Sequence, residues 1–459
     1  MSETQQTEQQ EDSEARHSNR DSPAVAHIRI VFGRSSRSVH EVRSSGTTLG
    51  RGATDPVRDI QIDDARMSRQ HSRIEHTASG WQLVDLESRN GGFVDGGRAR
   101  ARTPLVDGSV IRLGDTLMVF RVSPPADDGH AETVAFPGAS PAACAIRRRI
   151  EKLAATSGHV LILGETGTGK ERVARALSEH RSKRPYVTLN CAELTHEFVR
   201  SELFGHTQGS FTGATRTKAG LVEVAADGVL FLDEIGELLW DVQGDLLRFL
   251  DDGYYRPLGG ELKHSSVRIV AATNVDLDHA VASTKFRRDL LARLRTSNAP
   301  LELPPLRERR EDIPQWTRLF LREAGHASLD EAWTVGALEC LLLYPWLENL
   351  RELRGIVRTL TADDSRIPWP TEALPARIRM HRATLRGHTE PPQPLRDEQS
   401  HPSREYTQAE IEDALRQMQG NVRAAAELLG IERRKFYRLC DRFEIVVDDH
   451  RGRVKKAKD

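Results

Sequence analysis

A glycine-rich segment, GETGTGK at 164–170, contains the residue types and spacing with the most specific chemistry in the sequence. It follows the apolar stretch VLIL at 160–163 and precedes the helical text KERVARALSEH. In that context backbone N–H groups turn inward around phosphate oxygens, and the helix N-terminus adds positive charge. Lys170 would reach the outer phosphates, and Glu171 stands where a Ser or Thr usually follows the lysine. The segment predicts a nucleotide site formed by Gly164, Glu165, Thr166, Gly167, Thr168, Gly169, Lys170 and Glu171.

Two carboxylates end a second candidate strand, VLFLDE at 229–234. We expect Asp233 to hold Mg²⁺ through water and Glu234 to polarise an attacking water. The segment AATN at 271–274 ends another strand, where Thr273 and Asn274 could sense the γ-phosphate. Together with the glycine-rich segment, these residues predict ATP and Mg²⁺ as cofactors.

The elements that must position these residues are strands that alternate with helices. Four continuous apolar runs are typical of a buried parallel sheet: VLIL (160–163), YVTLN (186–190), VLFLDE (229–234) and VRIVAA (267–272). Helical text lies between them, and helix-rich text follows from about 312 to 361. The sequence therefore predicts an α/β P-loop domain with a helical lid over residues 133–362.

The flanking segments have different patterns, so we expect a multidomain chain. Short alternating stretches such as HIRIVFG and WQLVDL predict a β-sandwich over 24–123. Residues 405–447 read as three short helices that start at a capping box of Thr407 and Glu410. We interpret residues 1–23 as disordered, 124–132 and the Pro-rich 363–404 as linkers, and 448–459 as a basic tail.

Bulk composition excludes several classes of protein. A chain of 459 residues is too long for one core, and its formal net charge of -1 gives no global preference for a partner. The four cysteines are far apart, which argues against a disulfide framework or a cysteine metal site. Because no apolar run reaches about 18 residues, we expect a cytoplasmic protein without a membrane partner.

One large apolar residue, Phe211, lies in the flexible stretch GHTQGSFTGAT at 205–215. Glycines let the backbone bend and offer little for a ring to pack against. Two interpretations remain open from the residues alone: the ring folds back into the core as a plug, or it is presented to a partner.

The stretch from about 136 to 361 resembles the AAA+ domain of the sigma-54-dependent transcriptional activators. Its segments occur in family order, and they include GETGTGKE, LNCAEL, ELFGHTQGSFTGA, GVLFLDEIGEL, VRIVAATN, FRRDLLARL and LPPLRERREDIP. The resemblance implies that Asn190 restrains Glu234 until the nucleotide state changes. It also implies that Arg287 and Arg293 act as arginine fingers across a subunit boundary, so the working form is expected to be a homo-oligomeric, hexameric ring.

The same resemblance gives Phe211 a role. GSFTGA is similar to the family's GAFTGA loop, so Phe211 and Thr212 are expected to contact sigma-54 in the RNA polymerase holoenzyme. Two departures stand out: Ser210 replaces Ala, and WLENLREL at 346–353 replaces the usual WPGNVREL. Arg351 remains the candidate for the second nucleotide sensor.

The predicted sandwich resembles the forkhead-associated (FHA) domain through LGRG (49–52), SRQH (68–71) and DLESRNGGFVDG (85–96). That family binds phosphothreonine peptides. By resemblance Arg51 pairs with the phosphate, Ser68 donates to it, Arg69 assists, and Asn90 holds the peptide backbone. His71 is interpreted as a structural brace. The implied partner is a phosphothreonine-containing protein or a Ser/Thr kinase.

The C-terminal stretch GNVRAAAELLGIERRKFYRLCDRFEI (420–445) resembles a Fis-type helix-turn-helix. We expect Ala425, Ala426 and Leu429 to face its core. The reading helix would enter the major groove of enhancer DNA. Its expected DNA contacts are Arg433, Arg434, Lys435, Arg438 and Arg442.

The leading hypothesis is an FHA-regulated ATPase that activates sigma-54 RNA polymerase. Two alternatives remain: an FHA-gated DNA-binding scaffold whose ATPase is silent, and an AAA+ ATPase that remodels a partner other than sigma-54.

Overall fold

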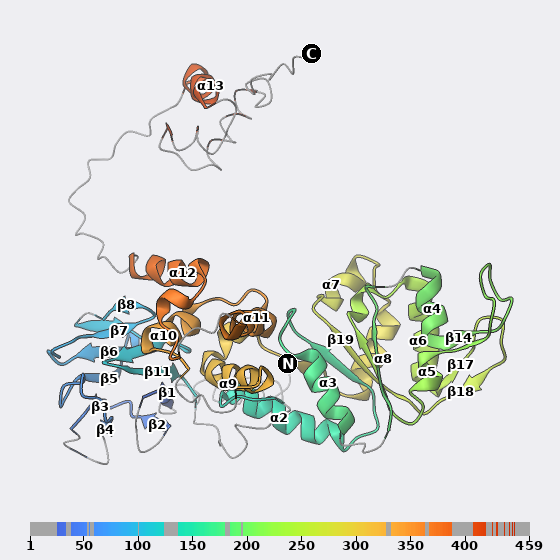
Figure 1. Cartoon of the computed structure of the whole chain (residues 1–459), viewed down its shortest axis with the longest axis horizontal. Helices are drawn as coiled ribbons and strands as arrows, with labels where there is room; N and C mark the ends of the chain where they lie inside the picture. The colour runs from blue at the N-terminus through green and yellow to red at the C-terminus, as the bar shows by residue number, and fades with distance from the viewer. Residues whose placement is uncertain are drawn as a thin grey trace, which may run out of the picture. The chain divides into compact units, whose positions relative to one another are not determined.

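The structure, a computed structural model, describes residues 25–33, 38–52, 55, 59–99, 101–123, 136–179, 184–193, 196–326, 332–362, 367–387, 407–418 and single positions between 425 and 445. The chain forms two compact units, residues 1–389 and 390–459, and each is described by itself (Figure 1). The predicted disordered segment 1–23, the linker 124–132 and the basic tail 448–459 lie outside the described residues.

The first part of the larger unit is a sandwich of two sheets. One sheet has the order β2 (Val39–Val42), β1 (Ala26–Phe32), β11 (Thr116–Arg121), β10 (Val110–Leu113), β7 (Gly92–Val94), β8 (Gly97–Arg98). The other has the order β4 (Ile60–Gln61), β3 (Thr47–Gly50), β5 (Ser72–Thr77), β6 (Gly80–Asp85), β9 (Arg102–Pro104). Residues that alternate along the strands, such as Ile74 and Leu83, fill the core between the sheets, where Trp81 meets Phe120 edge-on. This confirms the predicted β-sandwich.

A five-stranded parallel sheet forms the centre of the next part. Its order is β13 (Tyr186–Asn190), β16 (Val229–Asp233), β19 (Arg268–Thr273), β12 (Val160–Leu163), β20 (Leu301–Glu302). Four of these strands coincide with the four predicted apolar runs. Neighbouring residues of β12 point to opposite faces: Ile162 packs in one apolar core and Leu161 in another. Because both faces are covered, the strands need no polar alternation.

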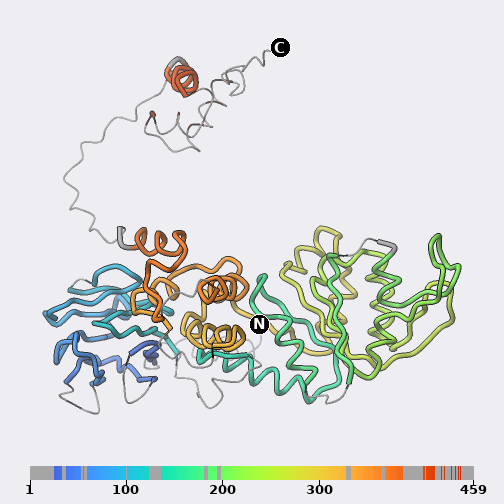
Figure 2. The backbone as a smooth tube through the Cα atoms, viewed as in Figure 1, coloured from blue at the N-terminus to red at the C-terminus, as the bar shows by residue number. Residues whose placement is uncertain are grey.

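Helices cover both faces of this sheet (Figure 1). They are α2 (Pro141–Ala154), α3 (Lys170–Glu179), α4 (His196–Phe204), α5 (Leu221–Val224), α6 (Trp240–Asp252), α7 (Leu277–Ala282) and α8 (Arg288–Ser297). Two short hairpins leave the layer (Figure 2): β14 (Gly205–His206) pairs with β15 (Lys218–Ala219), and β17 (Tyr254–Tyr255) pairs with β18 (Lys263–His264). The predicted α/β domain is therefore confirmed.

The lid follows as a group of helices. Its elements are η2 (Leu306–Glu308), η3 (Arg310–Asp312), α9 (Ile313–Glu323), α10 (Val335–Leu343), α11 (Asn349–Ala362), η4 (Thr371–Ala373) and α12 (Ala376–Gly387). The expectation of a linker over 363–404 is wrong for its first part, because η4 and α12 belong to the folded lid. Trp369 packs on Trp333 at 4.9 Å between ring centroids, and Ile378 is fully buried. The prolines of this stretch mark turns and helix starts around buried apolar residues, and not a linker.

In the smaller unit, α13 (Gln408–Gln417) begins at Thr407 with the predicted capping box to Glu410. Ile411, Leu415 and Phe436 are buried together, as is the predicted core residue Ala425. Leu429 packs against the same cluster, while Ala426 lies outside the described residues.

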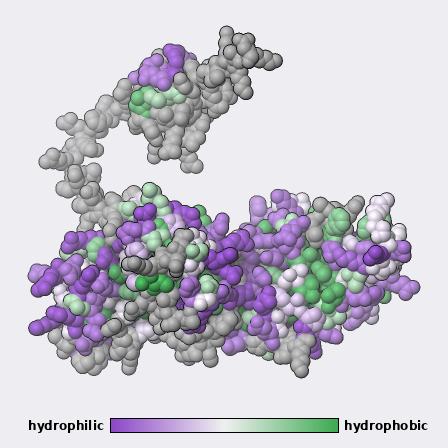
Figure 3. Space-filling model, in the orientation of Figure 1, coloured by the Kyte–Doolittle hydropathy of each residue, from purple (hydrophilic) through white to green (hydrophobic). Residues whose placement is uncertain are grey.

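Hydrophilic residues make up much of the coloured surface of the larger unit in Figure 3, with hydrophobic patches between them. Among the residues that the structure describes, no helix is both long and apolar enough to cross a membrane.

A buried histidine gives the fold a measurable acid sensitivity. His159, just before β12, accepts a hydrogen bond from the backbone N–H of Ile269 at 3.0 Å. Burial, with Arg293 and Arg268 nearby, lowers the pKa of His159 from 6.5 to about 4. The folded state therefore disfavours the protonated ring. The resulting loss of stability is absent above pH 6.5 and grows as the pH falls toward 4.

We predict that lowering the pH from 7.5 to 5 reduces the free energy of unfolding of both proteins. The reduction should be about 2 kcal/mol larger for the wild type than for His159→Gln. Urea denaturation at both pH values measures the difference. His264→Gln, which changes an exposed histidine, serves as the control, and its unfolding free energy should change between the two pH values by the same amount as that of the wild type. An equal pH dependence of the wild type and His159→Gln would contradict the assignment.

Candidate functional site

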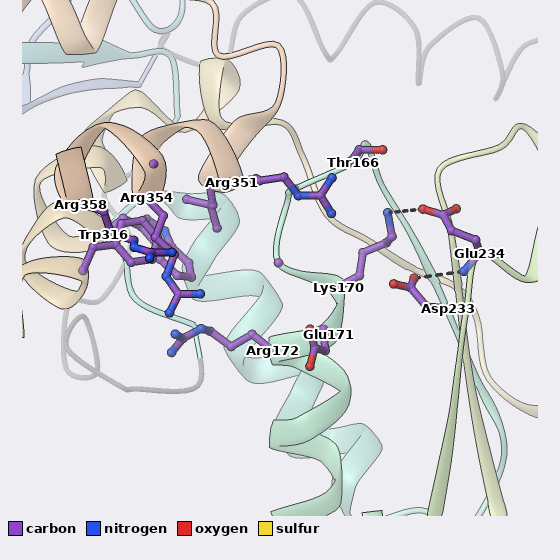
Figure 4. A pocket seen from close by; sticks show the side chains of 15 residues that line it. Thr166, Lys170, Glu171, Arg172, Asp233, Glu234, Trp316, Arg351, Arg354 and Arg358 are labelled. Atoms are coloured by element: carbon purple, nitrogen blue, oxygen red, sulfur yellow. Dashed lines mark hydrogen bonds and ion pairs between the residues drawn. The ribbon is translucent and has the colours of Figure 1, made fainter. Parts of the chain in front are cut away.

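A cavity of about 400 Å³ lies where the carboxyl ends of the parallel strands meet the lid. The phosphate-loop segment and α3 line one side, and β16 contributes the carboxylates (Figure 4). The opposite side comes from α9 and α11 of the lid. The full lining is Thr166, Gly167, Gly169, Lys170, Glu171, Arg172, Asp233, Glu234, Trp316, Phe320, Leu350, Arg351, Arg354, Gly355 and Arg358.

Lys170 is the first residue of α3, and its ammonium group points back across the glycine loop. Its Nζ donates to the carbonyl oxygens of Gly164 at 2.9 Å and Glu165 at 3.3 Å. It also lies 4.0 Å from a carboxylate oxygen of Glu234. Burial lowers the pKa of Lys170, and the charges of Glu234 and Asp233 oppose that shift. A buried cation whose described partners are two carbonyls and one carboxylate at 4.0 Å is well suited to bind an anion.

The carboxylates of Asp233 and Glu234 fit a magnesium ion. Burial, followed by the charge of Glu234, raises the pKa of Asp233. Two oxygen-bearing groups beside a predicted phosphate site are the donors that Mg²⁺ prefers. Glu234 itself has a left-handed backbone conformation (φ 51°). Residues other than glycine rarely adopt this conformation, and those that do are often found at functional sites.

The end of β19 completes the nucleotide edge. The Asn274 side-chain amide donates to the hydroxyl of Thr166 at 2.8 Å, and its backbone N–H lies 3.4 Å from Glu234 Oε2. Asn274 therefore links the glycine loop to the carboxylate that is expected to act on water.

The lid side of the cavity carries positive charge. Figure 4 shows Arg351, Arg354 and Arg358 projecting from α11. Arg172 of α3 joins them, and Arg172 and Arg354 share the carboxylate of Glu323 at 2.6 and 2.9 Å. This cluster makes the lid side of the cavity positively charged. Arg351, the residue that the sequence analysis proposed as the second nucleotide sensor, belongs to it.

The phosphate loop is braced from the lid by groups that do not line the cavity. Arg307 binds both carboxylate oxygens of Glu165, at 2.8 and 2.6 Å. Asn349 is fully buried and donates to Glu165 Oε2 and to the carbonyl of Thr166. The hydrogen bonds from Arg307 lower the pKa of Glu165. The Glu165 side chain is therefore held by the lid, while its carbonyl oxygen accepts from Lys170 and Thr168 within the loop.

The replacement of the usual WPGN by WLEN at 346–349 leaves these contacts to the phosphate loop intact. Leu347 is 75% exposed, so the apolar replacement points to solvent. A Cβ added at Gly167 would lie 2.1 Å from the carbonyl oxygen of Glu348, and the N–H of Leu350 donates to Gly167 O. The turn before α11 therefore packs directly on the phosphate loop without the usual Pro and Gly.

The loops at one end of the sandwich bring the predicted phosphothreonine residues together. The backbone N–H of Arg51 donates to Ser68 O, and the Arg51 side chain is exposed. Ser68 Oγ accepts from the N–H of Arg89 at 3.2 Å, and Asn90 donates to the carbonyl of Arg66 at 2.7 Å.

His71 braces these loops from inside, as expected. It is fully buried and bonds the N–H of Ser68 through Nδ1 and the carbonyl of Gly91 through Nε2. Arg69 is exposed beside Gly52, whose N–H donates to its carbonyl.

The GSFTGA segment forms the tip of the β14–β15 hairpin. Phe211 is half-buried, edge-on to His206 at 5.1 Å, and Thr212 is exposed. The tip also touches the second hairpin, since a Cβ added at Gly259 would lie 2.9 Å from that of Ser210. Phe211 therefore rests on its own hairpin and does not plug the main core.

Comparisons with known proteins cover most of the chain. Family models match the FHA domain at 47–114, the sigma-54 interaction domain at 136–299, the AAA+ ATPase lid domain at 307–390 and the bacterial regulatory protein, Fis family, at 407–439. The DNA-binding transcriptional regulator NtrC of Azospirillum brasilense is 37% identical over 345 residues, which are 70% of this chain and 71% of that protein. The chain belongs to the NtrC-type sigma-54 activators.

Other relatives match about half of the chain. NtrC of Rhizobium meliloti (strain 1021) is 44% identical over 240 residues, 51% of this chain and 49% of that protein. NtrC of Escherichia coli (strain K12) is 46% identical over 232 residues, 49% of this chain and 48% of that protein. The chain thus spans about half the length of several curated relatives. A crystal structure of NtrX from Brucella abortus in complex with ATP is 30% identical, covers 69% of this chain and 71% of that one, and has a TM-score of 0.47.

Three predicted catalytic residues of this NtrC-type chain lie outside the cavity lining. The expected bond from Asn190 to Glu234 is absent from the described residues. Asn190 instead donates to Glu193 at 2.8 Å and accepts from Ala192 N, closing a tight turn after β13.

The two predicted finger residues, Arg287 and Arg293, are engaged within their own chain. Arg287 binds Asp289 and lies over the ring of Trp240, while Arg293 donates to the carbonyl of Leu250 and pairs with Asp251. The predicted DNA contacts Arg433, Arg434, Lys435, Arg438 and Arg442 lie outside the described residues.

Sequence reasoning missed the lid residues that brace or line the site. Arg307 and Asn349 were visible in LPPLRERREDIP and WLENLREL, but neither segment shows which residue meets the phosphate loop. Arg354 and Arg358 follow Arg351 at helical spacing, which was the available signal for a cationic face.

We predict that Lys170→Ala weakens ATP binding by roughly 100-fold, because a charged hydrogen bond worth about 3 kcal/mol is lost. Titration with a fluorescent ATP analogue measures the change. Lys152→Ala, at an exposed position of α2, is the matched control and should bind normally. Normal binding by Lys170→Ala would show that the nucleotide does not use this loop.

Proposed function

We propose that this NtrC-type activator hydrolyses ATP to open promoters held by sigma-54 RNA polymerase, under control of phosphothreonine recognition by its FHA domain. The observation that carries the proposal is the convergence of Lys170, Asp233 and Glu234 on one cavity between the sheet and the lid, beside which Asn274 bonds the lining residue Thr166.

The chain's own residues supply the parts of a hydrolytic site. Lys170 and the inward N–H groups of the glycine loop bind phosphate oxygens, and the cationic lid residues cover the same side. Glu234 orients and polarises water, and Asn274 connects its position to the loop. Mg²⁺, when bound near Asp233, supplies charge neutralisation of the phosphates.

A ring of subunits accounts for the two arginines outside the cavity. Arg287 and Arg293 line no part of their own chain's site, so in this proposal they serve a neighbouring one. Their contacts to Asp289 and Asp251 would be exchanged for phosphate contacts on assembly. We expect a hexamer, the usual form in this family.

The GSFTGA tip is the proposed contact with sigma-54. Its ring rests on His206, its Thr212 hydroxyl is free of the core, and Gly213 has open space around it. Such a tip can change its position without repacking the domain. The Fis-type segment would bind enhancer DNA, which places the working protein in the bacterial cytoplasm.

The FHA loops are the proposed signal input. Arg51 is exposed beside Ser68 and Asn90, which suits a doubly charged phosphate and leaves an unphosphorylated threonine without its main partner. The ligand class is a phosphothreonine-containing protein or a Ser/Thr kinase.

We predict that Thr212→Ala keeps ATP turnover but loses open-complex formation, because the loop contact is removed without changing the cavity. The test measures phosphate release and promoter melting with sigma-54 holoenzyme. Glu234→Gln is the comparison and should lose both activities. Normal promoter melting by Thr212→Ala would refute the assignment of the loop. ATP turnover without promoter melting by the wild type would favour a partner other than sigma-54.

We also predict that Ser68→Ala weakens binding of a phosphothreonine peptide at least tenfold, because one hydrogen bond to a charged group is lost. Calorimetry with a phosphorylated and an unphosphorylated peptide measures this. Ser79→Ala, in the exposed turn between β5 and β6, should leave the affinity unchanged. Equal affinities for all three proteins would refute the site.

A further inference from the structure

The sandwich is docked on the lid through a buried charge cluster. Arg121, at the end of β11, is 7% exposed and binds both carboxylate oxygens of Glu311 at 2.8 and 2.5 Å. Its guanidinium also donates to the carbonyl of Glu308 at 2.7 Å and to Asp107 at 2.9 Å. Glu311 is fully buried, so Arg121 is its compensating charge.

Neighbouring contacts extend this joint. Arg310 donates to the carbonyl of Gly108 at 3.2 Å and to Asp95 at 3.4 Å. Val110 and Leu117 of the sandwich are buried in the same apolar core as Leu343 of the lid. The two parts are therefore packed together and not merely tethered.

The same short stretch, which we call the 306–312 segment, also holds the phosphate loop. Arg307 binds Glu165, and the fully buried Arg309 donates to the carbonyl of Thr168 at 2.9 Å. The N–H of Leu306 donates to Asn349, which braces the loop from α11.

Contacts to the two partners interleave along this segment. Arg307 and Arg309 reach the phosphate loop, while Glu308, Arg310 and Glu311 reach the sandwich. Because the residues belong to two consecutive 3₁₀ turns, a displacement of one set moves the other.

The docked end of the sandwich is not the end with the phosphothreonine loops. Strand β7 begins at Gly92, after the Asn90 loop, and ends before Asp95 at the joint. At the loop end, Arg66 pairs with Asp115 in the turn between β10 and β11. The proposed peptide surface is therefore left open while the opposite end is fixed.

We propose that Arg121 and Glu311 are positioning residues for the ATPase: through the 306–312 segment, the docked FHA domain holds the phosphate loop in its nucleotide-binding arrangement. This inference rests on the proposed nucleotide site, since Arg121 touches no residue of the phosphate loop and acts only through the segment. It gives the FHA domain a role in nucleotide affinity that is separate from peptide recognition.

The test compares ATP affinities of full-length variants with a fluorescent ATP analogue. We expect Arg121→Gln to weaken binding about fivefold to tenfold, within the usual range of coupling between sites. Arg121→Lys, which keeps the charge opposite Glu311, should recover part of the affinity. Arg73→Gln, at a half-exposed arginine of β5 that pairs with Glu75, is the control and should stay within about twofold of wild type.

A second readout separates coupling from a general loss of structure. Coupling is reciprocal, so ATP should slow hydrogen exchange of residues 116–121 in the wild type and not in Arg121→Gln. If Arg121→Gln does not fold, the double variant Arg121→Gln/Glu311→Gln removes the orphaned carboxylate and should show the same weakened binding.

The outcomes are distinguishable. A wild type that binds no ATP refutes the nucleotide site itself. A wild type that binds ATP, with unchanged affinity in the folded Arg121 variants or no ATP-dependent protection of residues 116–121, overturns only the coupling proposal.

Discussion

The parallel pairing of β12, β16 and β19 is the constraint on which the site depends. Leu163 lies opposite Thr273, and β16 ends at Asp233, so the three strands end at one edge of the sheet. The glycine loop, the carboxylates and Asn274 meet there because each follows its strand directly. Packing on both sheet faces fixes this register, since a slip of one residue would move Leu161 and Ile162 into each other's cores, where their packing partners differ.

That edge forms only one side of the binding site. The lid forms the other side and contributes positively charged side chains to it. Arg307 and Asn349 hold the Glu165 carboxylate, and Arg351 reaches the cavity from the same helix that begins at Asn349. Because the brace and the candidate sensor share a helix start, the position of α11 is tied to that of the phosphate loop. The lid is thereby part of the nucleotide site and not a cover added to it.

The sequence was sufficient for the sheet, the sandwich and the place of the glycine loop between β12 and α3, because apolar runs and glycine spacing are local signals. It was insufficient at 363–387, where the prolines led to the prediction of a linker although Trp369 and Ile378 are buried core residues. Asn190 was expected to bond Glu234 but closes its own turn with Glu193. Arg307 and Arg121 could not be predicted, because their partners lie more than a hundred residues away and no pattern of spacing encodes such contacts.

The buried Glu311 limits how such chains can exchange the domain that precedes the ATPase. A domain placed before the ATPase in exchange for the sandwich would have to bring its own cation to the place where Arg121 lies, or the buried carboxylate would lose its hydrogen-bonded partner. Replacing the sandwich thus requires either such a cation in the new domain or a compensating change in the lid. Recombination at the junction alone would yield a poorly folded hybrid, which favours inheritance of the two parts as a pair.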